Sequence, residues 1–266
     1  MTRAPASAVD RLGRAAVGLA GLLVYAFLYL PLVVLILFSF NASAINTWPI
    51  RGWTLSWYQQ LGLDDAMIAA VANSLSVAVR AVAIAVVLGT LGALAVHRYR
   101  FPGKGAFLFV ATLPLVLPGV VTGIAMLIFF ASLNVGLSLT TVLIGHATFC
   151  IVLVLNNVLA RLVRVPRELE EAAGDLGANA LRTFWHVTLP SIRTAVLSGA
   201  LLAFTLSFDE VVVTFFLTGR DNTLPMEIYS RLRHEYTPEI NAIATLIVAV
   251  SVVLVVASQA ALKEQE

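Results

Sequence analysis

Long apolar segments that carry almost no charge are the feature that most restricts how this chain can fold. An α-helix needs about 20 consecutive apolar residues to cross the hydrocarbon core of a bilayer. Inside that core a backbone must satisfy its own hydrogen bonds, which a helix does. The sequence therefore predicts an all-α polytopic membrane protein with six transmembrane helices, at approximately residues 15–40, 72–96, 107–131, 138–160, 195–217 and 241–261.

The composition supports a membrane protein and excludes several other classes. Charged residues make up 12% of the 266 residues and apolar residues 59%, against about 25% and 45–50% in soluble domains. The net charge of +2 is too small to indicate a nucleic-acid partner. The single cysteine, Cys150, lies in an apolar run, which excludes an intrachain disulfide framework and a cysteine-rich metal site.

The first apolar run has basic residues before it, as a signal peptide would. Its uncharged stretch, residues 15–40, is much longer than the roughly 7–15 residues of a signal-peptide core. We therefore expect an uncleaved first span.

The distribution of Lys and Arg predicts the orientation in the membrane. Twelve of them lie at the N-terminus (Arg3 among them), in the second and fourth connections and in the C-terminal tail, whereas four lie in the first and fifth connections. Cytoplasmic connections carry the excess of basic residues. Both termini, and the polar connection between the fourth and fifth spans, are therefore expected on the cytoplasmic side of a bacterial inner membrane.

That polar connection, which we call the EAA segment (residues 161–194), carries a spaced motif. It contains Glu171-Ala172-Ala173, then Gly177, and finally Val187-Thr188-Leu189-Pro190. A long, motif-like polar insert between two apolar runs indicates a functional connection rather than a simple turn.

Local chemistry predicts two short helices in the EAA segment. Pro166 suits the first turn of a helix, and Gly177 suits its C-terminal cap because glycine tolerates left-handed backbone angles. Asn179 can cap a second short helix, which Pro190 would end. The acidic residues near the positive end of the first helix dipole are Glu168, Glu170 and Glu171.

The second short helix has an apolar face. Leu181, Phe184 and Trp185 are spaced i, i+3 and i+4 and so share one side of a helix. An apolar knob on a short charged helix beside a membrane fits the groove of another protein. The alternative is an amphipathic helix lying on lipid headgroups, with Arg182 and His186 facing water.

The motif resembles the EAA loop of binding-protein-dependent ABC importer permeases, E-A-A-x3-G-x9-I-x-L-P, with Val187 in place of the isoleucine. From Gly145 onward the sequence is also similar to spermidine/putrescine permeases, most clearly over 207–213, 223–230 and 238–246. The resemblance implies a type I, MetI-like fold with one permease domain, residues 1–266. It also implies that the residues coupling transport to an ATPase are Glu171, Ala172, Ala173, Gly177, Leu181, Phe184, Trp185, Leu189 and Pro190.

Two further segments contain candidate pathway residues. In the third span Pro114 and Pro118 should kink or break the helix, and irregular backbone inside a membrane is tolerated only against protein or a wet cavity. The third span, with Pro118, is thus expected to line the pathway, or else the kink only improves helix packing. In the fourth span, the lone His146 is interpreted as an interhelical hydrogen-bonding residue rather than a ligand.

The fifth span contains two adjacent acids, Asp209 and Glu210. A charged side chain at the bilayer centre costs about 2.5–3.5 kcal/mol on insertion scales, so two carboxylates require a reason. Helical rise places Arg80 of the second span at a similar depth. Either Arg80 neutralises one acid as a structural pair, or at least one acid faces the pathway and attracts a cationic solute; both can hold together.

The resemblance implies a translocation subunit rather than an enzyme. Its expected partners are a dimeric ATP-binding subunit, a second permease subunit, an extracytoplasmic solute-binding protein and membrane lipid. The chain has no G-x4-G-K-[ST] phosphate loop, so ATP and Mg²⁺ are expected on the ATPase and no cofactor or metal on this chain.

Polyamine import is the predicted function, with two alternatives. Polyamine permeases often carry an acidic residue after the third-span proline, whereas Gly119 follows Pro118 here. Phosphonate, sugar or ferric iron import therefore remains open. An ion-gradient-driven secondary transporter would need no EAA loop, and usually shows a repeated half that is not evident here.

Overall fold

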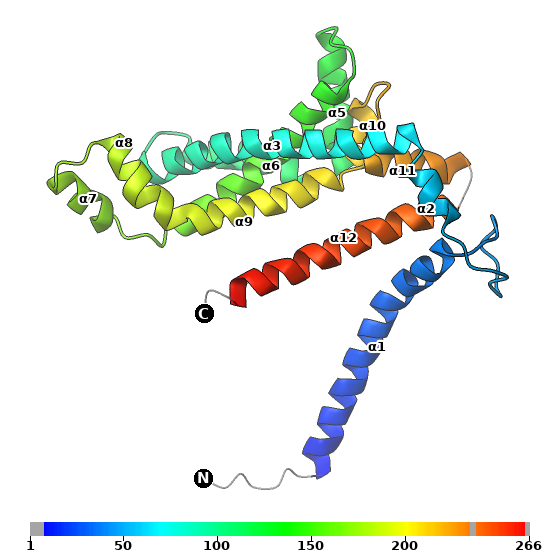
Figure 1. Cartoon of the computed structure of the whole chain (residues 1–266). Helices are drawn as coiled ribbons and strands as arrows, with labels where there is room; N and C mark the ends of the chain where they lie inside the picture. The colour runs from blue at the N-terminus through cyan, green and yellow to red at the C-terminus, as the bar shows by residue number, and fades with distance from the viewer. Residues whose placement is uncertain (1–7, 235–237, 264–266) are drawn as a thin grey trace. The chain divides into compact units, whose positions relative to one another are not determined.

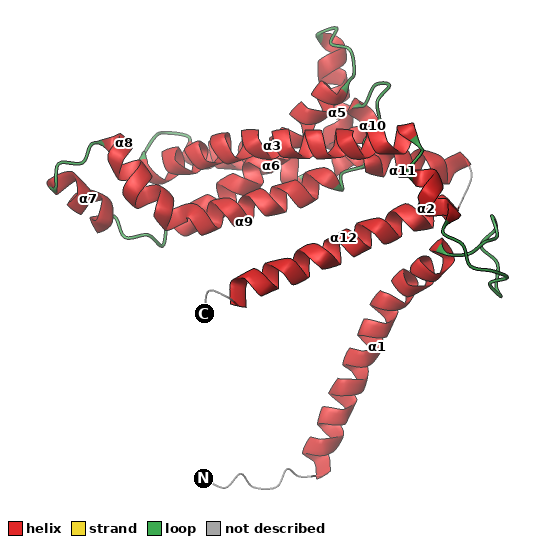
Figure 2. Cartoon of the chain, viewed as in Figure 1, coloured by secondary structure: helices red, strands yellow, loops and turns green. Residues whose placement is uncertain are grey.

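The computed structural model describes residues 8–234 and 238–263, and the described chain is built from helices (Figure 2). Within those residues the only extended pairing is an isolated bridge between Asn41 and Trp53. The all-α prediction is confirmed. The helices, including one π-helical turn η1, are α1 (Ala8–Ser39), α2 (Ser56–Leu61), α3 (Asp65–Arg98), α4 (Lys104–Val116), α5 (Gly119–Ser132), α6 (Leu139–Leu162), α7 (Glu168–Asp175), α8 (Ala180–Thr183), η1 (Phe184–Thr188), α9 (Leu189–Phe208), α10 (Val212–Leu217), α11 (Leu224–His234) and α12 (Pro238–Lys263).

The chain forms two compact units, residues 1–65 with 231–266 and residues 66–230. In the first unit α12 packs against both α1 and α2. An ion-pair cluster joins the ends of its elements: Arg231 Nη1 lies 2.6 Å from Asp64 Oδ2 and 3.5 Å from Glu239 Oε2. Arg3, which contributed to the predicted orientation, lies outside the described residues.

The second unit is organised around α6, which packs between α3 and α9 (Figure 1). Small residues repeat every four positions on α3, at Ala81, Ala85, Gly89 and Ala93, and the three alanines are fully buried. A Cβ added at Gly89 would lie 2.8 Å from the carbonyl oxygen of Ile151 on α6. The small-residue stripe therefore lets two backbones approach closely, the usual way helices associate in membranes.

The number of spans agrees only partly with the six predicted. Within the described residues, four helices are long and apolar enough to cross a bilayer, and the bent pair α4–α5 makes a fifth if it is one span. The predicted sixth span, 241–261, lies within α12, of which Pro238–Val252 qualifies as a shorter apolar helix.

The predicted break in the third span is present. Helix α4 ends at Val116, α5 begins at Gly119, and the two axes differ by 106°. Pro118 is the N-cap residue of α5 with extended backbone (ψ 134°), and Leu117 before it is also extended (ψ 143°), because a proline steers the preceding residue out of helical geometry. Pro114 is accommodated within α4.

The fifth span differs from the predicted continuous helix, residues 195–217. It is helical from Ala180 to Phe208, non-helical at residues 209–211, and helical again in α10. The expectation that Pro190 ends the second short helix is also wrong, because α8, η1 and α9 run on without interruption. The Leu189 N–H bonds the carbonyl of Phe184, five residues back; this π turn widens the helix just before Pro190, which lies at the start of α9 and lacks an N–H to donate.

Candidate functional site

The first half of the EAA segment forms the predicted helix, although α7 begins at Glu168 and Pro166 lies just before it rather than in its first turn. Helix α7 has Glu168, Glu170 and Glu171 in its first turn, where a carboxylate is favoured by the helix dipole. Gly177 has φ +84°. Its N–H bonds the Gly174 carbonyl at 2.8 Å while the Ala178 N–H bonds the Ala173 carbonyl at 2.9 Å. These two bonds form a Schellman cap, so the glycine of the motif is there because only glycine adopts this conformation cheaply.

The second half contains the predicted N-cap. The Asn179 side chain accepts a hydrogen bond of 2.9 Å from the Arg182 N–H, and α8 begins at the next residue. Leu181 and Trp185 are 67% and 57% exposed. Phe184 departs from the predicted shared face: it is half-buried and packs against the core around α6. The exposed apolar surface of this helix therefore consists of Leu181 and Trp185, and Leu176 at the preceding turn is 90% exposed.

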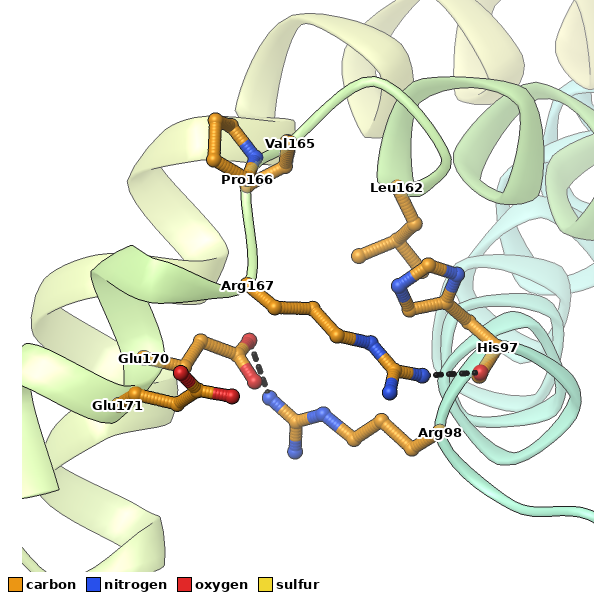
Figure 3. Close-up of a pocket in the computed structure, with 8 residues that line it drawn as sticks. All are labelled: His97, Arg98, Leu162, Val165, Pro166, Arg167, Glu170 and Glu171. Carbon is orange, nitrogen blue, oxygen red and sulfur yellow. Dashed lines mark hydrogen bonds and ion pairs between the residues drawn. The ribbon is translucent and has the colours of Figure 1, made fainter.

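A polar network that sequence reasoning missed ties α7 to two other elements, and Figure 3 shows its link between Glu170 and Arg98. Glu170 Oε1 lies 2.6 Å from Nη2 of Arg98, at the end of α3. The Thr188 hydroxyl donates to the same oxygen at 2.6 Å, and Arg98 Nη2 also donates to the Thr188 oxygen at 3.0 Å. Glu170 thereby joins α7, α3 and η1.

The electrostatic state of Glu170 follows from these contacts. Partial burial alone would raise the pKa of Glu170, but the hydrogen bonds from Thr188 and Arg98 outweigh it and lower the pKa below the ordinary value of 4.5. The carboxylate is therefore ionised at neutral pH. In the sequence, Glu170 and Arg98 appear only as two charges in separate polar connections, and no spacing rule pairs residues so far apart.

Two more hydrogen bonds and a small cavity complete this region. Arg167 Nη2 donates to the His97 carbonyl at 3.2 Å, and Arg161 Nε donates to the Ser191 carbonyl at 3.0 Å. The first bond ties the EAA segment to the end of α3, and the second joins the two ends of the segment to each other. A cavity of about 220 Å³ lies beside them, lined by His97, Arg98, Leu162, Val165, Pro166, Arg167, Glu170 and Glu171 (Figure 3).

Several of the motif residues are accessible, whereas Thr188 is buried and bonded to Glu170. Glu171 and Ala172 are exposed, and Ala173 is half-buried. At the other end, Leu189 is half-buried against the core and Pro190 is exposed. This arrangement leaves one side of α7 and α8 free to contact a partner.

The two acids of the fifth span lie at the break between α9 and α10. Asp209 is exposed and Glu210 half-buried, and both line a cavity of about 460 Å³ together with Leu153, Leu202, Thr205 and Leu206. Glu210 Oε1 accepts a hydrogen bond of 2.9 Å from the Val213 N–H, so its carboxylate helps to start α10. Asp209 has no side-chain hydrogen bond or ion pair within the described part of the chain.

Arg80 does not form the predicted pair with either acid. It is exposed on α3, and among residues 8–234 and 238–263 it makes no ion pair with Asp209 or Glu210. Similar depth in two helices did not bring the side chains together, because the break turns the acids toward the cavity and toward the α10 backbone. A pathway role for Arg80 stays a prediction.

The bend at Pro118 also borders a cavity, of about 280 Å³, lined almost wholly by apolar residues of α4 and α5. His146 is buried and bonds two hydroxyls on other helices, Ser207 at 2.8 Å and Thr214 at 2.9 Å. Its interpretation as an interhelical hydrogen-bonding residue is confirmed.

Comparison with known proteins defines the class. Residues 85–264 match the family "Binding-protein-dependent transport system inner membrane component". The chain belongs to this family and is a multi-pass inner-membrane permease. The predicted family is confirmed, and the alternative of an ion-gradient-driven transporter is set aside.

Within the family the chain is similar to polyamine-system permeases. It is 43% identical over 235 residues to the putrescine transport system permease protein PotI of Escherichia coli, covering 85% of this chain and 83% of that protein. It is 39% identical over 241 residues to the spermidine/putrescine transport system permease protein PotC of Escherichia coli, covering 89% of each.

A solved structure confirms the fold. A chain of a bacterial ABC transporter involved in import of the acidic polysaccharide alginate superposes with a TM-score of 0.75 at 21% identity, covering 97% of this chain and 99% of that one. At this identity the likeness concerns the fold alone.

Proposed function

We propose that this chain is a transmembrane permease subunit of an ATP-driven importer that moves polyamines, putrescine or spermidine, into the cytoplasm. The observation that carries the proposal is its 43% and 39% identity, over 85% or more of its length, to two permeases of putrescine and spermidine/putrescine systems. Translocation, rather than catalysis, is its role.

The EAA segment is the proposed site of coupling to a dimeric ATP-binding subunit. Leu176, Leu181 and Trp185 are exposed apolar side chains on a segment rich in charge. Large exposed aromatic and aliphatic residues with a charged rim are typical of a docking surface. The chain itself has no phosphate-binding loop, so ATP and Mg²⁺ are bound, and ATP is hydrolysed, on the partner.

The Schellman cap and the Glu170 network support a mechanical role for this segment. Both make α7 and α8 a defined body attached to α3 and to the helix that continues as α9. Movement of the ATPase dimer is thus delivered to two membrane helices together, which shifts the permease between inward-facing and outward-facing states.

Asp209 is the proposed contact for the cationic solute. Its carboxylate is exposed, faces a cavity and has no partner among the described residues, whereas Glu210 is engaged by the Val213 N–H. A negative side chain in a cavity raises the local concentration of a cation. Pro118 is proposed to shape the route through the bend between α4 and α5, which borders a separate apolar cavity.

The remaining partners are a second permease subunit, a solute-binding protein outside the membrane, and lipid. Both termini and the EAA segment are placed in the cytoplasm, because twelve Lys and Arg residues lie in the connections on that side against four on the other.

Uptake measurements test the proposal. The complete transporter, with its ATPase, second permease and binding protein, is expressed in cells that lack other polyamine uptake, and labelled putrescine and spermidine are supplied. We expect ATP-dependent uptake of at least one polyamine, absent when the ATPase is inactivated. Uptake of a phosphonate, a sugar or ferric iron with no polyamine uptake would overturn the solute assignment while leaving the permease role intact.

A further inference from the structure

A buried polar chain connects α6 to both sides of the break in the fifth span. His146 is 1% exposed and lies on α6. Its Nδ1 lies 2.8 Å from the hydroxyl of Ser207, in the last turn of α9, and its Nε2 lies 2.9 Å from the hydroxyl of Thr214, in α10. One imidazole ring therefore spans the non-helical residues 209–211.

The directions of these hydrogen bonds follow from which of the groups carry a proton to donate. The Thr214 hydroxyl lies 3.0 Å from the carbonyl oxygen of Glu210, which can only accept. Because a hydroxyl has one proton, Thr214 donates to Glu210 and accepts from His146 Nε2–H. Nδ1 is then the acceptor for the Ser207 hydroxyl, so the chain runs in one direction from α9 through α6 to the backbone of the break.

Other contacts also hold α10 on α6. The Thr141 hydroxyl donates to the Leu217 carbonyl at 2.7 Å. A Cβ added at Gly145 would lie 2.5 Å from Leu217 Cδ1. The Thr141 hydrogen bond fixes the far end of α10, and Gly145 also lies against Val213 near the break. The His146 bridge is the hydrogen-bonded contact between α6 and the end of α10 next to Glu210.

The contacts of Glu210 leave Asp209 as the more available acid. The Glu210 backbone carbonyl accepts a hydrogen bond from Thr214, and its side-chain carboxylate accepts one from the Val213 N–H. Asp209, one residue earlier, is exposed beside the cavity. If residues 209–211 rewound into helix, Asp209 would move with the register of α10.

We propose that His146 is a positioning residue: its two hydrogen bonds across the break hold residues 209–211 in the non-helical form that presents the Asp209 carboxylate to the cavity. The inference deepens the proposed function and rests on it for the role of that carboxylate toward a cationic solute.

Accessibility of position 209 tests the positioning directly, without any solute. In the complete transporter, Cys150→Ala removes the only cysteine of this chain, and Asp209→Cys adds a reporter. The rate of labelling by a cationic methanethiosulfonate is followed on this chain by mass spectrometry. Adding His146→Phe, which keeps an aromatic side chain but removes both ring nitrogens, should lower the rate about tenfold, the order expected when a buried hydrogen bond is lost.

Matched variants separate positioning from general damage. Thr214→Val should lower the rate as His146→Phe does, and Thr214→Ser, which keeps the hydroxyl, should restore it. A reporter at Thr205→Cys, on α9 and lining the same cavity, should label at the same rate in every background. If His146→Phe fails to assemble, the test is the comparison of Thr214→Val with Thr214→Ser. Equal labelling of position 209 in these two variants overturns the proposal.

Transport kinetics link the positioning to function. With Asp209 intact, Thr214→Val should raise the KM for putrescine with little change in maximal rate, and Thr214→Ser should not. Slower labelling of position 209 without any polyamine uptake by the unaltered transporter would refute the proposed solute and leave the positioning role standing. Labelling of position 209 that is unchanged by His146→Phe and Thr214→Val, alongside normal polyamine uptake, would refute the positioning role and leave the proposed solute standing.

Discussion

Glu170 and Arg98, 72 residues apart in the chain, form an ion pair in which Oε1 and Nη2 are 2.6 Å apart. The pair joins the helix that carries the EAA motif to the end of α3, and Thr188 adds a hydroxyl to the same oxygen. A segment proposed to receive force from an ATPase is thus attached to a membrane helix by charge-assisted hydrogen bonds, which are among the stronger polar contacts in proteins.

Glu170→Gln should weaken this attachment. It keeps the shape of the side chain but removes the charge, and we expect a stability loss of about 1 kcal/mol, since the pair is partly solvent-screened. Uptake should fall while the ATPase activity of the complex becomes less dependent on the binding protein. Thermal unfolding and uptake measure the two effects; Glu168→Gln, an exposed residue of the same turn, is the control. Equal unfolding temperatures and equal uptake for Glu170→Gln and Glu168→Gln would contradict a role for the Glu170–Arg98 ion pair.

The stabilisation that the Glu170 contacts provide should depend on pH and should be lost in acid. Because the pKa of Glu170 in the folded protein lies below the ordinary value of 4.5, its contribution is fully present above pH 4.5 and is lost as the pH falls through the lower folded value. The stability difference between the unaltered chain and Glu170→Gln should therefore be constant near neutral pH and shrink in acid. A stability difference between the two proteins that grows on acidification would contradict a lowered pKa of Glu170.

Trp185→Ala and Leu181→Ala should reduce binding of the ATPase. Both side chains are exposed and make few contacts within the chain, so their removal should cost affinity rather than folding, by roughly tenfold or more for an aromatic anchor. Co-purification of the ATPase with the permease measures this. Leu197→Ala, 63% exposed on the apolar part of α9, serves as the control; undiminished co-purification by both test variants would remove the docking assignment.

Asp209→Asn should lower polyamine uptake more than Glu210→Gln does. The Asn side chain fills the same space without the charge that attracts a cation, whereas the Glu210 carboxylate is already used by the Val213 N–H. Uptake at several putrescine concentrations should show a raised KM for Asp209→Asn. Unchanged uptake with normal assembly in both variants would eliminate these acids from the pathway.

Gly177→Ala should destabilise the EAA segment by about 1 kcal/mol, because φ is +84° there and a Cβ is disfavoured in the left-handed region. Gly174→Ala is a matched control in the same segment: it lies within α7 with open space around it, so alanine should be neutral or stabilising. Limited proteolysis of the segment compares the two variants. More rapid cleavage of Gly174→Ala than of Gly177→Ala would contradict this account of the cap.

The amino-acid sequence by itself determined the features that depend on neighbouring residues. Helices follow from apolar runs, the break near Pro118 from the chemistry of proline, and the caps at Gly177 and Asn179 from local hydrogen bonding. The EAA motif identified the family for the same reason, since its spacing is contained in one short segment.

Only the tertiary structure decided how distant residues meet. Arg98 and Glu170 pair because two polar connections are folded against each other. Arg80 does not pair with Asp209, although helical rise places them at similar depth, because the break at residues 209–211 redirects the acids. Phe184 likewise packs against the core instead of sharing an exposed face with Leu181 and Trp185. Side-chain direction at a helix irregularity is set by what the neighbouring helices offer, and no periodicity along one segment contains that information.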